Sequence, residues 1–185
     1  MLLTERELCP SIRDPEVPEV PPFANNPWRV INVRPRHEQV VARQLEGRCE
    51  LYLPTYRSVR KWHDRKMTLD LPLFPGYVFV RINASERARI LKTSGVRSLL
   101  AFGNEPAQVK ESEIDEIKRI VASGCAVSPS ALILGNRVRV IDGPMQGVEG
   151  VLQEFKNTCY LVVVVQMVSR AVKVTIERDW VKGIR

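Results

Sequence analysis

Residues 73–80 (LFPGYVFV) constrain the fold more than any other part of the chain. A Pro-Gly pair makes a rigid corner, and the residues that follow it have the composition of a strand. Side chains alternate between the two faces of a strand, so Tyr77 and Phe79 are predicted on one face and Val78 and Val80 on the other. The segment therefore predicts a buried strand that is entered through a tight turn.

A second signature lies in residues 135–150 (GNRVRVIDGPMQGVEG). A strand of alternating basic and apolar residues is followed by a Gly-Pro turn and by two further glycines, where the chain must bend sharply. This pattern predicts a hairpin.

The composition indicates a globular protein. The chain has 185 residues, of which 44% are hydrophobic, enough for one medium domain or two small ones. No apolar run approaches the length of a membrane span. Glu5, Arg6 and Glu7 stand where a secretion signal needs apolar residues, so we expect a cytoplasmic protein without a membrane segment.

The cysteines and histidines do not predict a metal site. The four cysteines are widely separated, and the chain has only two histidines (Cys9, Cys49, Cys125, Cys159, His37 and His63). Zinc ribbons and redox sites need closely spaced pairs of these residues. We expect reduced thiols, no metal and no cofactor.

The positive charge is unevenly distributed. The formal net charge is +7, and residues 28–66 hold ten Lys and Arg side chains against four acidic ones. A concentrated positive surface favours a polyanionic partner such as nucleic acid. Solvated surface charge is the alternative interpretation.

Proline and small polar residues divide the chain. Residues 1–27 contain six of the thirteen prolines, which excludes a helix or a central strand and predicts a disordered tail. Residues 124–131 have the composition of a flexible linker. These boundaries predict one domain over residues 28–123 and a second over residues 132–185.

The order of elements predicts an α+β fold. Residues 28–123 combine strands (28–33, 51–53, 77–82 and 96–102), helices (38–45, from about 85, and from a capping box at 112–115) and an exposed basic hairpin over 57–66. This order favours an antiparallel sheet flanked by helices. Residues 132–185 contain five strand-like segments (137–141, 148–155, 159–168, 171–176 and 180–181), which predict a small closed barrel.

Together these features resemble the NusG family of transcription factors. Residues 28–123 resemble the NusG N-terminal domain, and residues 132–185 resemble its SH3-like KOW barrel. The resemblance rests on Trp28 and Val30, Glu38 at the start of a helix, Pro54, the Phe74-Pro-Gly-Tyr77 turn, Gly95-Val96, and the glycines of the KOW-type turn. The resemblance extends to specialised paralogues within the family, such as RfaH and UpxY.

The resemblance implies a docking face for RNA polymerase. In the family, an apolar depression of the N-terminal domain binds the clamp helices of the largest polymerase subunit. Phe74, Tyr77 and Phe79 match the centre of that depression. The alternative is that these aromatic side chains fill the core of their own domain.

The resemblance also implies contact with the non-template strand and upstream DNA of the transcription bubble. The predicted residues lie at the turn before the first helix (Arg34, Arg36, His37 and Arg43) and on the basic hairpin (Arg57, Arg60, Lys61, Trp62, Arg65 and Lys66). The arginines and lysines would contact phosphate, and Trp62 would stack on a base.

The resemblance implies a further partner for the KOW barrel, either termination factor Rho or a small-subunit ribosomal protein. Met167 and Val168 occupy the predicted contact position, where many family members have an aromatic residue. Residues 160–165 (YLVVVV) favour a strand and disfavour refolding into a helix.

The resulting hypothesis is a monomeric, non-enzymatic elongation factor that modulates pausing or termination, in the direction of antitermination. The chain has no nucleophile elbow, P-loop, zinc-protease motif or dinucleotide fingerprint. The alternative is a ribosome-associated protein that binds RNA through its KOW domain. A factor that promotes pausing would use the same scaffold.

Overall fold

The computed structural model describes residue 23 and residues 25–61, 66–102, 105–130, 135–155 and 158–184. Of Arg60, Phe155 and Met167 it describes the backbone alone. The predicted tail over residues 1–27 lies almost entirely outside the described residues, as do Trp62 and Arg65.

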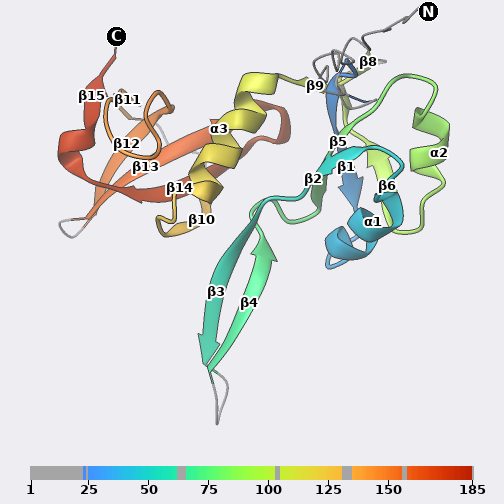
Figure 1. Ribbon diagram of the computed structural model, residues 1–185, viewed down its shortest axis with the longest axis horizontal. Helices are drawn as coiled ribbons and strands as arrows, with labels where there is room; N and C mark the ends of the chain where they lie inside the picture. Colours follow the sequence, from blue (N-terminus) through green and yellow to red (C-terminus); the bar gives the residue numbers. More distant parts are fainter. Residues whose placement is uncertain are drawn as a thin grey trace, which may run out of the picture.

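An antiparallel sheet, here called the N-terminal sheet, organises the first part of the chain. Its strands run in the order β2-β5-β1-β6, and a short strand β9 also pairs with β1. The strands are β1 (Trp28–Val33), β2 (Glu50–Tyr52), β5 (Tyr77–Arg81), β6 (Val96–Leu99) and β9 (Gln108–Val109). Helices α1 (Glu38–Leu45) and α2 (Arg87–Leu91) cover one face (Figure 1).

The two faces of the N-terminal sheet pack into different cores. Val78 and Val80 are buried with the apolar side chains of α1 and α2, whereas Phe79 is buried on the opposite face, where Tyr77 also packs. The predicted alternation along residues 77–80 is therefore confirmed. The face that carries Phe79 is called the aromatic face below.

Two hairpins extend from this sheet. Strands β3 (Thr55–Lys61) and β4 (Lys66–Pro72) form a two-stranded ribbon that projects away from the rest of the molecule, as expected for the basic hairpin (Figure 1). Strands β7 (Ala101–Phe102) and β8 (Glu105–Pro106) form a smaller hairpin that the sequence analysis did not predict.

Helix α3 (Glu111–Ala122) begins earlier than the sequence predicts. The predicted capping box at Ser112 is wrong, because the N-cap is Lys110 and no side chain caps the helix. The chain enters α3 almost directly from β9, so the helix starts where the strand ends. None of the helices in the described ranges is long and apolar enough to cross a membrane.

A six-stranded antiparallel sheet, here called the C-terminal sheet, follows α3. Its order is β10-β14-β13-β12-β11-β15. The strands are β10 (Val127–Ser130), β11 (Arg137–Val140), β12 (Glu149–Phe155), β13 (Thr158–Val165), β14 (Arg170–Ile176) and β15 (Val181–Gly183), with short 3-10 helices at Gln166–Val168 and Arg178–Trp180. The α+β class and the five expected strand segments are confirmed.

Strand β10 lies inside the segment predicted as a flexible linker. Val127 pairs with Val174 and Ser130 with Ala171, so this segment forms the first strand of the C-terminal sheet. The sequence analysis missed this strand because its residues are mostly small or polar. Their apolar content is too low to give an alternating pattern.

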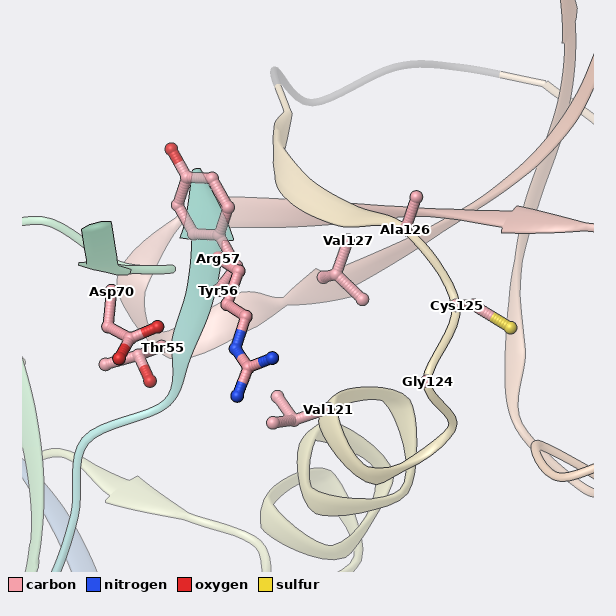
Figure 2. Close-up of a pocket in the computed structure, with 9 residues that line it drawn as sticks. All are labelled: Thr55, Tyr56, Arg57, Asp70, Val121, Gly124, Cys125, Ala126 and Val127. Carbon is pink, nitrogen blue, oxygen red and sulfur yellow. The ribbon is translucent and has the colours of Figure 1, made fainter. Parts of the chain in front are cut away.

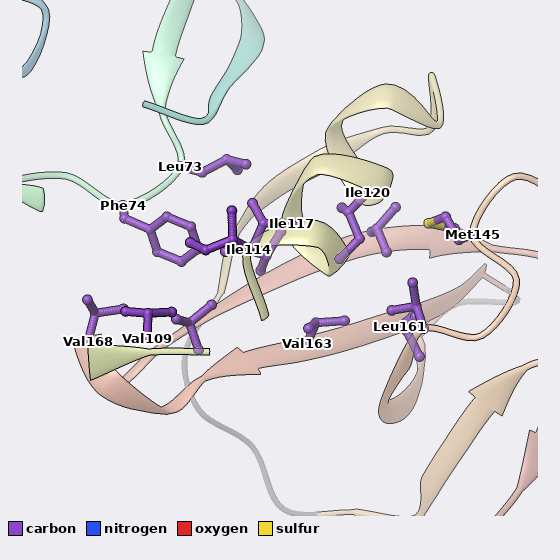
Figure 3. Packing of buried hydrophobic residues seen from close by; sticks show 14 of the residues in the cluster. Leu73, Phe74, Val109, Ile114, Ile117, Ile120, Met145, Leu161, Val163 and Val168 are labelled. Carbon is purple, nitrogen blue, oxygen red and sulfur yellow. The ribbon is translucent and has the colours of Figure 1, made fainter. Parts of the chain in front are cut away.

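Helix α3 joins the two sheets through one apolar cluster. Ile114, Ile117 and Ile120 are each almost fully buried, and their cluster includes residues of the aromatic face and of the C-terminal sheet. Figure 3 shows the isoleucines lying between Leu73 and Phe74 on one side and Leu161 and Val163 on the other. The helix therefore contributes to a core that both sheets share.

A buried arginine fastens α3 to the N-terminal sheet. Arg81 of β5 forms ion pairs with Glu50 of β2, at 3.1 Å, and with Glu111 at the start of α3, at 2.5 Å. Its guanidinium also lies 4.8 Å from the centre of the Trp28 ring. The two carboxylates and the ring compensate the cost of burying this charge.

Replacing Ile117 with alanine tests the shared core. We expect the substitution to lower the free energy of unfolding by about 2–4 kcal/mol, because it removes a fully buried side chain and leaves a cavity. Urea denaturation measures the change. The control Leu91→Ala removes a side chain that is 38% exposed and should cost much less. Equal losses in the two variants would contradict the shared core.

Candidate functional site: an aromatic face and its basic surroundings

The aromatic residues predicted to bind RNA polymerase lie together, but two of them are covered. Phe74 and Phe79 are 1% and 0% exposed, and their rings meet edge to face with centroids 5.6 Å apart. Tyr77 is half-buried at the margin of the same cluster. Tyr52 packs on Phe79 at 6.4 Å between centroids.

The cover over the aromatic face comes from α3 and the C-terminal sheet. The cluster that contains Phe74 and Phe79 also contains the three isoleucines of α3, together with Val163 and Val168 (Figure 3). The Arg119 guanidinium of α3 also donates a hydrogen bond to the Gln146 carbonyl in the KOW-type turn, at 2.9 Å. The C-terminal sheet is thus fixed to α3 by apolar packing and by a polar contact.

A buried carboxylate shapes the turn that leads into the aromatic strand. Glu38, at the start of α1, is 4% exposed and accepts a hydrogen bond from the backbone N–H of Gly76, at 2.7 Å. Gly76 has a φ of 85°, in the region that favours glycine. The sequence analysis placed Glu38 at the helix start but did not assign it this role, since nothing in the local pattern shows its partner.

The DNA-contacting residues predicted around the start of α1 are exposed. Arg34, Arg36, His37 and Arg43 all lie at the surface. Arg36 has a φ of 65°, an uncommon value for a residue other than glycine. The His37 ring lies 3.1 Å from the Pro35 carbonyl oxygen. Three of these side chains therefore surround the turn before α1, and Arg43 lies in the last turn of the helix.

A groove of about 570 Å³ separates α1 from the base of the β3–β4 hairpin. It brings together Arg36 and Arg43, whereas Arg34 and His37 do not line it. Its walls are largely apolar and include Tyr56, Leu71 and the prolines at positions 35, 72 and 75. The apolar walls suit a flat ring and the two arginines suit a phosphate, although Glu38 and Asp70 also line the groove.

The hairpin places part of the predicted basic set far from this groove. Arg57, Lys61 and Lys66 are exposed on the ribbon, while Trp62 and Arg65 lie outside the described residues. The side chain of Arg60 is not described either. The described hairpin residues thus extend the positive surface away from the sheet.

A second cavity of about 660 Å³ lies between the hairpin base and the segment from α3 to β10. Figure 2 shows Arg57, with its guanidinium directed toward Val121, and Asp70 on the neighbouring strand. Tyr56 and Val127 also line it. This cavity spans the junction between the two halves of the chain.

Of the two predicted KOW contact residues, Val168 is not free at the surface. Val168 is 5% exposed and belongs to the shared core, and the Met167 side chain lies outside the description. Elsewhere on the C-terminal sheet, Arg137 and Arg139 both form ion pairs with Glu149. The two arginines share one carboxylate, so this group keeps a net positive charge at the surface.

Burial raises the pKa of several titratable groups in the two cores and on α3. It raises the pKa of Tyr52 to about 12, and it raises the pKa of Cys49 to about 11 with a further increase from Glu86. Both groups are neutral near pH 7, so the Cys49 thiol is a poor nucleophile. Burial also raises the pKa of the Glu113 and Glu116 carboxyls on α3.

Within the part of the chain that the structure describes, no group of three or more His, Cys, Asp or Glu side chains could hold a metal ion. The arrangement offers apolar and aromatic surface, exposed cations and grooves. Such a set of groups is suited to binding macromolecules.

Comparison with known proteins assigns the chain to a family. A family model described as transcription termination factor NusG matches residues 26–118, the segment that forms the N-terminal sheet and most of α3. The chain belongs to the NusG family. Members of this family act in transcript elongation and termination.

Two curated relatives carry the same description, transcription termination/antitermination protein NusG. The protein of Pseudomonas aeruginosa is 32% identical over 142 residues, covering 69% of this chain and 80% of the relative. That of Lactococcus lactis is 29% identical over 175 residues, covering 85% and 93%.

A solved structure of NusG from Thermotoga maritima, whose description is "Domain interaction in Thermotoga maritima NusG", has the same fold. It superposes with a TM-score of 0.57 at 21% identity, over 88% of this chain and 99% of the other. The resemblance of residues 28–185 to the NusG family is therefore confirmed for the family and for the fold.

The contact between Glu38 and Gly76 gives a test of how the aromatic strand is positioned. We expect Glu38→Ala to lower the free energy of unfolding by about 1–3 kcal/mol, because the partly buried N–H of Gly76 loses its acceptor. Glu38→Gln keeps an acceptor oxygen and should cost less. Urea denaturation measures both variants, and a larger loss for glutamine than for alanine would contradict this role.

Proposed function

We propose that this protein is a non-enzymatic, cytoplasmic transcription factor that binds RNA polymerase during elongation and reduces pausing or termination. The observation that carries the proposal is the family match over residues 26–118, because this segment contains both the aromatic face and the basic turn. The names of the curated relatives support an action at termination.

Polymerase docking is assigned to the aromatic face, with Phe74, Tyr77 and Phe79 at its centre and the clamp helices of the largest subunit as the partner. Large aromatic side chains give much contact area with little rotamer entropy to lose. Since Phe74 and Phe79 are covered, docking requires α3 or the C-terminal sheet to move away from them. The half-exposed Tyr77 is the residue that a partner reaches first.

Nucleic-acid contact is assigned to the exposed turn and the hairpin. Arg34, Arg36, His37 and Arg43 would contact the non-template strand, and the groove beside Arg36 and Arg43 would receive a base. Arg60, Lys61, Trp62 and Arg65 of the hairpin would follow upstream DNA. Exposure of the described members of this set supports the assignment.

The KOW partner, Rho or a small-subunit ribosomal protein, would bind around Met167 and Val168. Burial of Val168 in the shared core means that this partner also requires the two sheets to separate. Polymerase docking and KOW partner binding therefore favour the same opening, and each should assist the other.

The alternative of a ribosome-associated RNA-binding protein has less support. The family model and the two curated relatives are described as transcription termination or antitermination proteins, which favours the transcription factor.

Substitution of Tyr77 tests polymerase docking. If Tyr77 is a principal contact, Tyr77→Ala should weaken binding to a reconstituted elongation complex by about 2 kcal/mol or more, which is roughly 30-fold. The affinity for the elongation complex is compared with the affinity for the same nucleic-acid scaffold without polymerase. Tyr160→Ala, a half-buried tyrosine on the C-terminal sheet, is the control. Unchanged affinity of a folded Tyr77→Ala protein would remove the aromatic face from the proposal.

Substitution of Arg119 tests the required opening. Arg119→Glu removes the hydrogen bond to Gln146 and adds a negative charge near Glu116 and Glu149, so the C-terminal sheet should separate more easily. We expect a larger radius of gyration in solution scattering and polymerase affinity higher by about two- to fivefold, because more molecules are competent to bind. Arg178→Glu, at an exposed pair with Glu154, is the matched control. An opened variant with unchanged affinity would show that the cover does not limit docking.

A further inference from the structure

We infer that an acidic repeat near the N-terminus of this chain docks into the groove between α1 and the base of the β3–β4 hairpin. Residues 14–22 read DPEVPEVPP, so the triplet Pro-Glu-Val occurs twice and is followed by a further proline. A proline therefore stands at every third position from 15 to 21.

A spacing of three matches the polyproline II helix, which has three residues per turn. In that conformation the prolines would lie along one edge, Val17 and Val20 along a second, and Glu16 and Glu19 along the third. The repeat would thus present two apolar edges and one acidic edge. Because proline fixes φ in advance, docking of such a segment costs little conformational entropy.

The walls of the groove suit the two apolar edges. Val40 of α1 lines the groove and is 46% exposed, so its apolar side chain is left largely in contact with solvent. Tyr56 and Leu71 line the groove from the hairpin. Grooves that recognise polyproline II ligands have aromatic and apolar walls of this kind.

The cations at the groove suit the acidic edge. Arg36 and Arg43 both line it and are exposed. Within the described ranges, no ion pair joins either guanidinium to a carboxylate. Residues 14–22 carry three carboxylates and no cation, so the charges of the repeat and of these arginines are complementary.

The two carboxylates in the lining do not cancel this attraction. Glu38 is buried and accepts the hydrogen bond from the Gly76 N–H. Asp70 stands opposite Arg57 in the ladder of the β3–β4 hairpin, so a positive charge accompanies this carboxylate.

The chain before β1 is long enough to reach the groove. The Pro27 carbonyl is held at the start of β1, where it accepts a hydrogen bond from the Ile82 N–H at 3.4 Å. Strand β1 has six residues and spans about 20 Å, and Pro35 lies just beyond it at the groove. From Asn25 back to Pro18 the chain can extend about 22 Å, at about 3.1 Å per residue. A segment tethered this closely has a high effective concentration at the groove, so a weak contact is enough to hold it.

Docking of the repeat has a consequence for nucleic acid. The repeat occupies the groove that the proposed function assigns to a base, and Glu16 and Glu19 repel phosphate. The segment therefore lowers the affinity of this surface for nucleic acid. This consequence rests on the proposed function, whereas docking of the repeat does not.

The test attaches a nitroxide spin label to Cys9, close before the repeat, in the full chain. Cys125→Ser removes the half-buried thiol, and the other described thiols, of Cys49 and Cys159, are buried. Amide signals are recorded by NMR with the label oxidised and then reduced, because the unpaired electron broadens the signals of nearby amides.

We expect broadening of the amides of Gln39, on α1, and Gly76, in the turn before β5, with little change for Val172 in the C-terminal sheet. No broadening at Gln39 and Gly76, or equal broadening at all three, would overturn the inference. Spin-labelled protein is also mixed with unlabelled, isotope-enriched protein. Broadening in that mixture would show that the segment of a second copy fills the groove, which would overturn docking within one chain.

Charge reversal tests the acidic edge. Glu16→Lys/Glu19→Lys should abolish the broadening at the groove, because like charges then face each other. The matched control Glu5→Lys/Glu7→Lys makes the same change of charge outside the repeat and should retain the broadening. Equal losses in the two variants would overturn the inference, since overall charge would then explain the contact.

A charge swap tests the basic side of the groove. Arg36→Glu/Arg43→Glu should abolish the broadening in the unmodified repeat and restore it in combination with Glu16→Lys/Glu19→Lys. Urea denaturation verifies that each variant is folded. Failure of the combined variant to restore the contact, in a folded protein, would exclude these two arginines as the docking partner.

Binding of a fluorescein-labelled DNA single strand, without polymerase, separates docking from its consequence. We expect Glu16→Gln/Glu19→Gln to bind the strand about two- to fivefold more tightly than Glu5→Gln/Glu7→Gln, because the groove is free in more molecules. Broadening at the groove without this gain would uphold docking and remove the groove from the proposed nucleic-acid contact. A gain in DNA affinity without broadening would overturn docking.

Discussion

The burial of one helix between two sheets is the constraint on which the rest of this structure depends. Helix α3 presents Ile114, Ile117 and Ile120 to a core that contains residues of both sheets. Arg81 fixes the first turn of the helix to the N-terminal sheet, and Arg119 contacts the C-terminal sheet from the other side. Since buried apolar area is the main stabilising contribution, the two halves of the chain gain stability by remaining packed on α3.

This packing sets the free-energy requirement for the proposed function. The aromatic side chains assigned to polymerase and Val168, assigned to the KOW partner, are buried in the same cluster. A partner can bind either set only by replacing the apolar contacts that the other sheet now supplies. The groove that contains Arg36 and Arg43 lies between α1 and the base of the β3–β4 hairpin, and neither Phe74, Phe79 nor Val168 lines it.

Local patterns predicted much of the fold and some of the site. The strand before Ile82 and the alternation of Phe79 and Val80 follow from a period of two, and α1 follows from apolar residues at helical spacing. Strand β10 was missed because its residues are small and polar, and its partner β14 lies more than forty residues away. The start of α3 was misplaced because β9, rather than a capping side chain, determines it. The exposure of Arg34, Arg36 and Arg43 could be anticipated, whereas the grooves could not.

The sequence by itself determined the family, the α+β class, the basic surface and the strand that carries Phe79, because each depends on residues that are close together in the chain. Only the tertiary structure decided that Phe74 and Val168 share one core, that Glu38 holds Gly76, and that Arg36 and Leu71 line one groove. These contacts join residues far apart in the chain. Their geometry depends on how whole elements pack, which no local pattern of residues encodes.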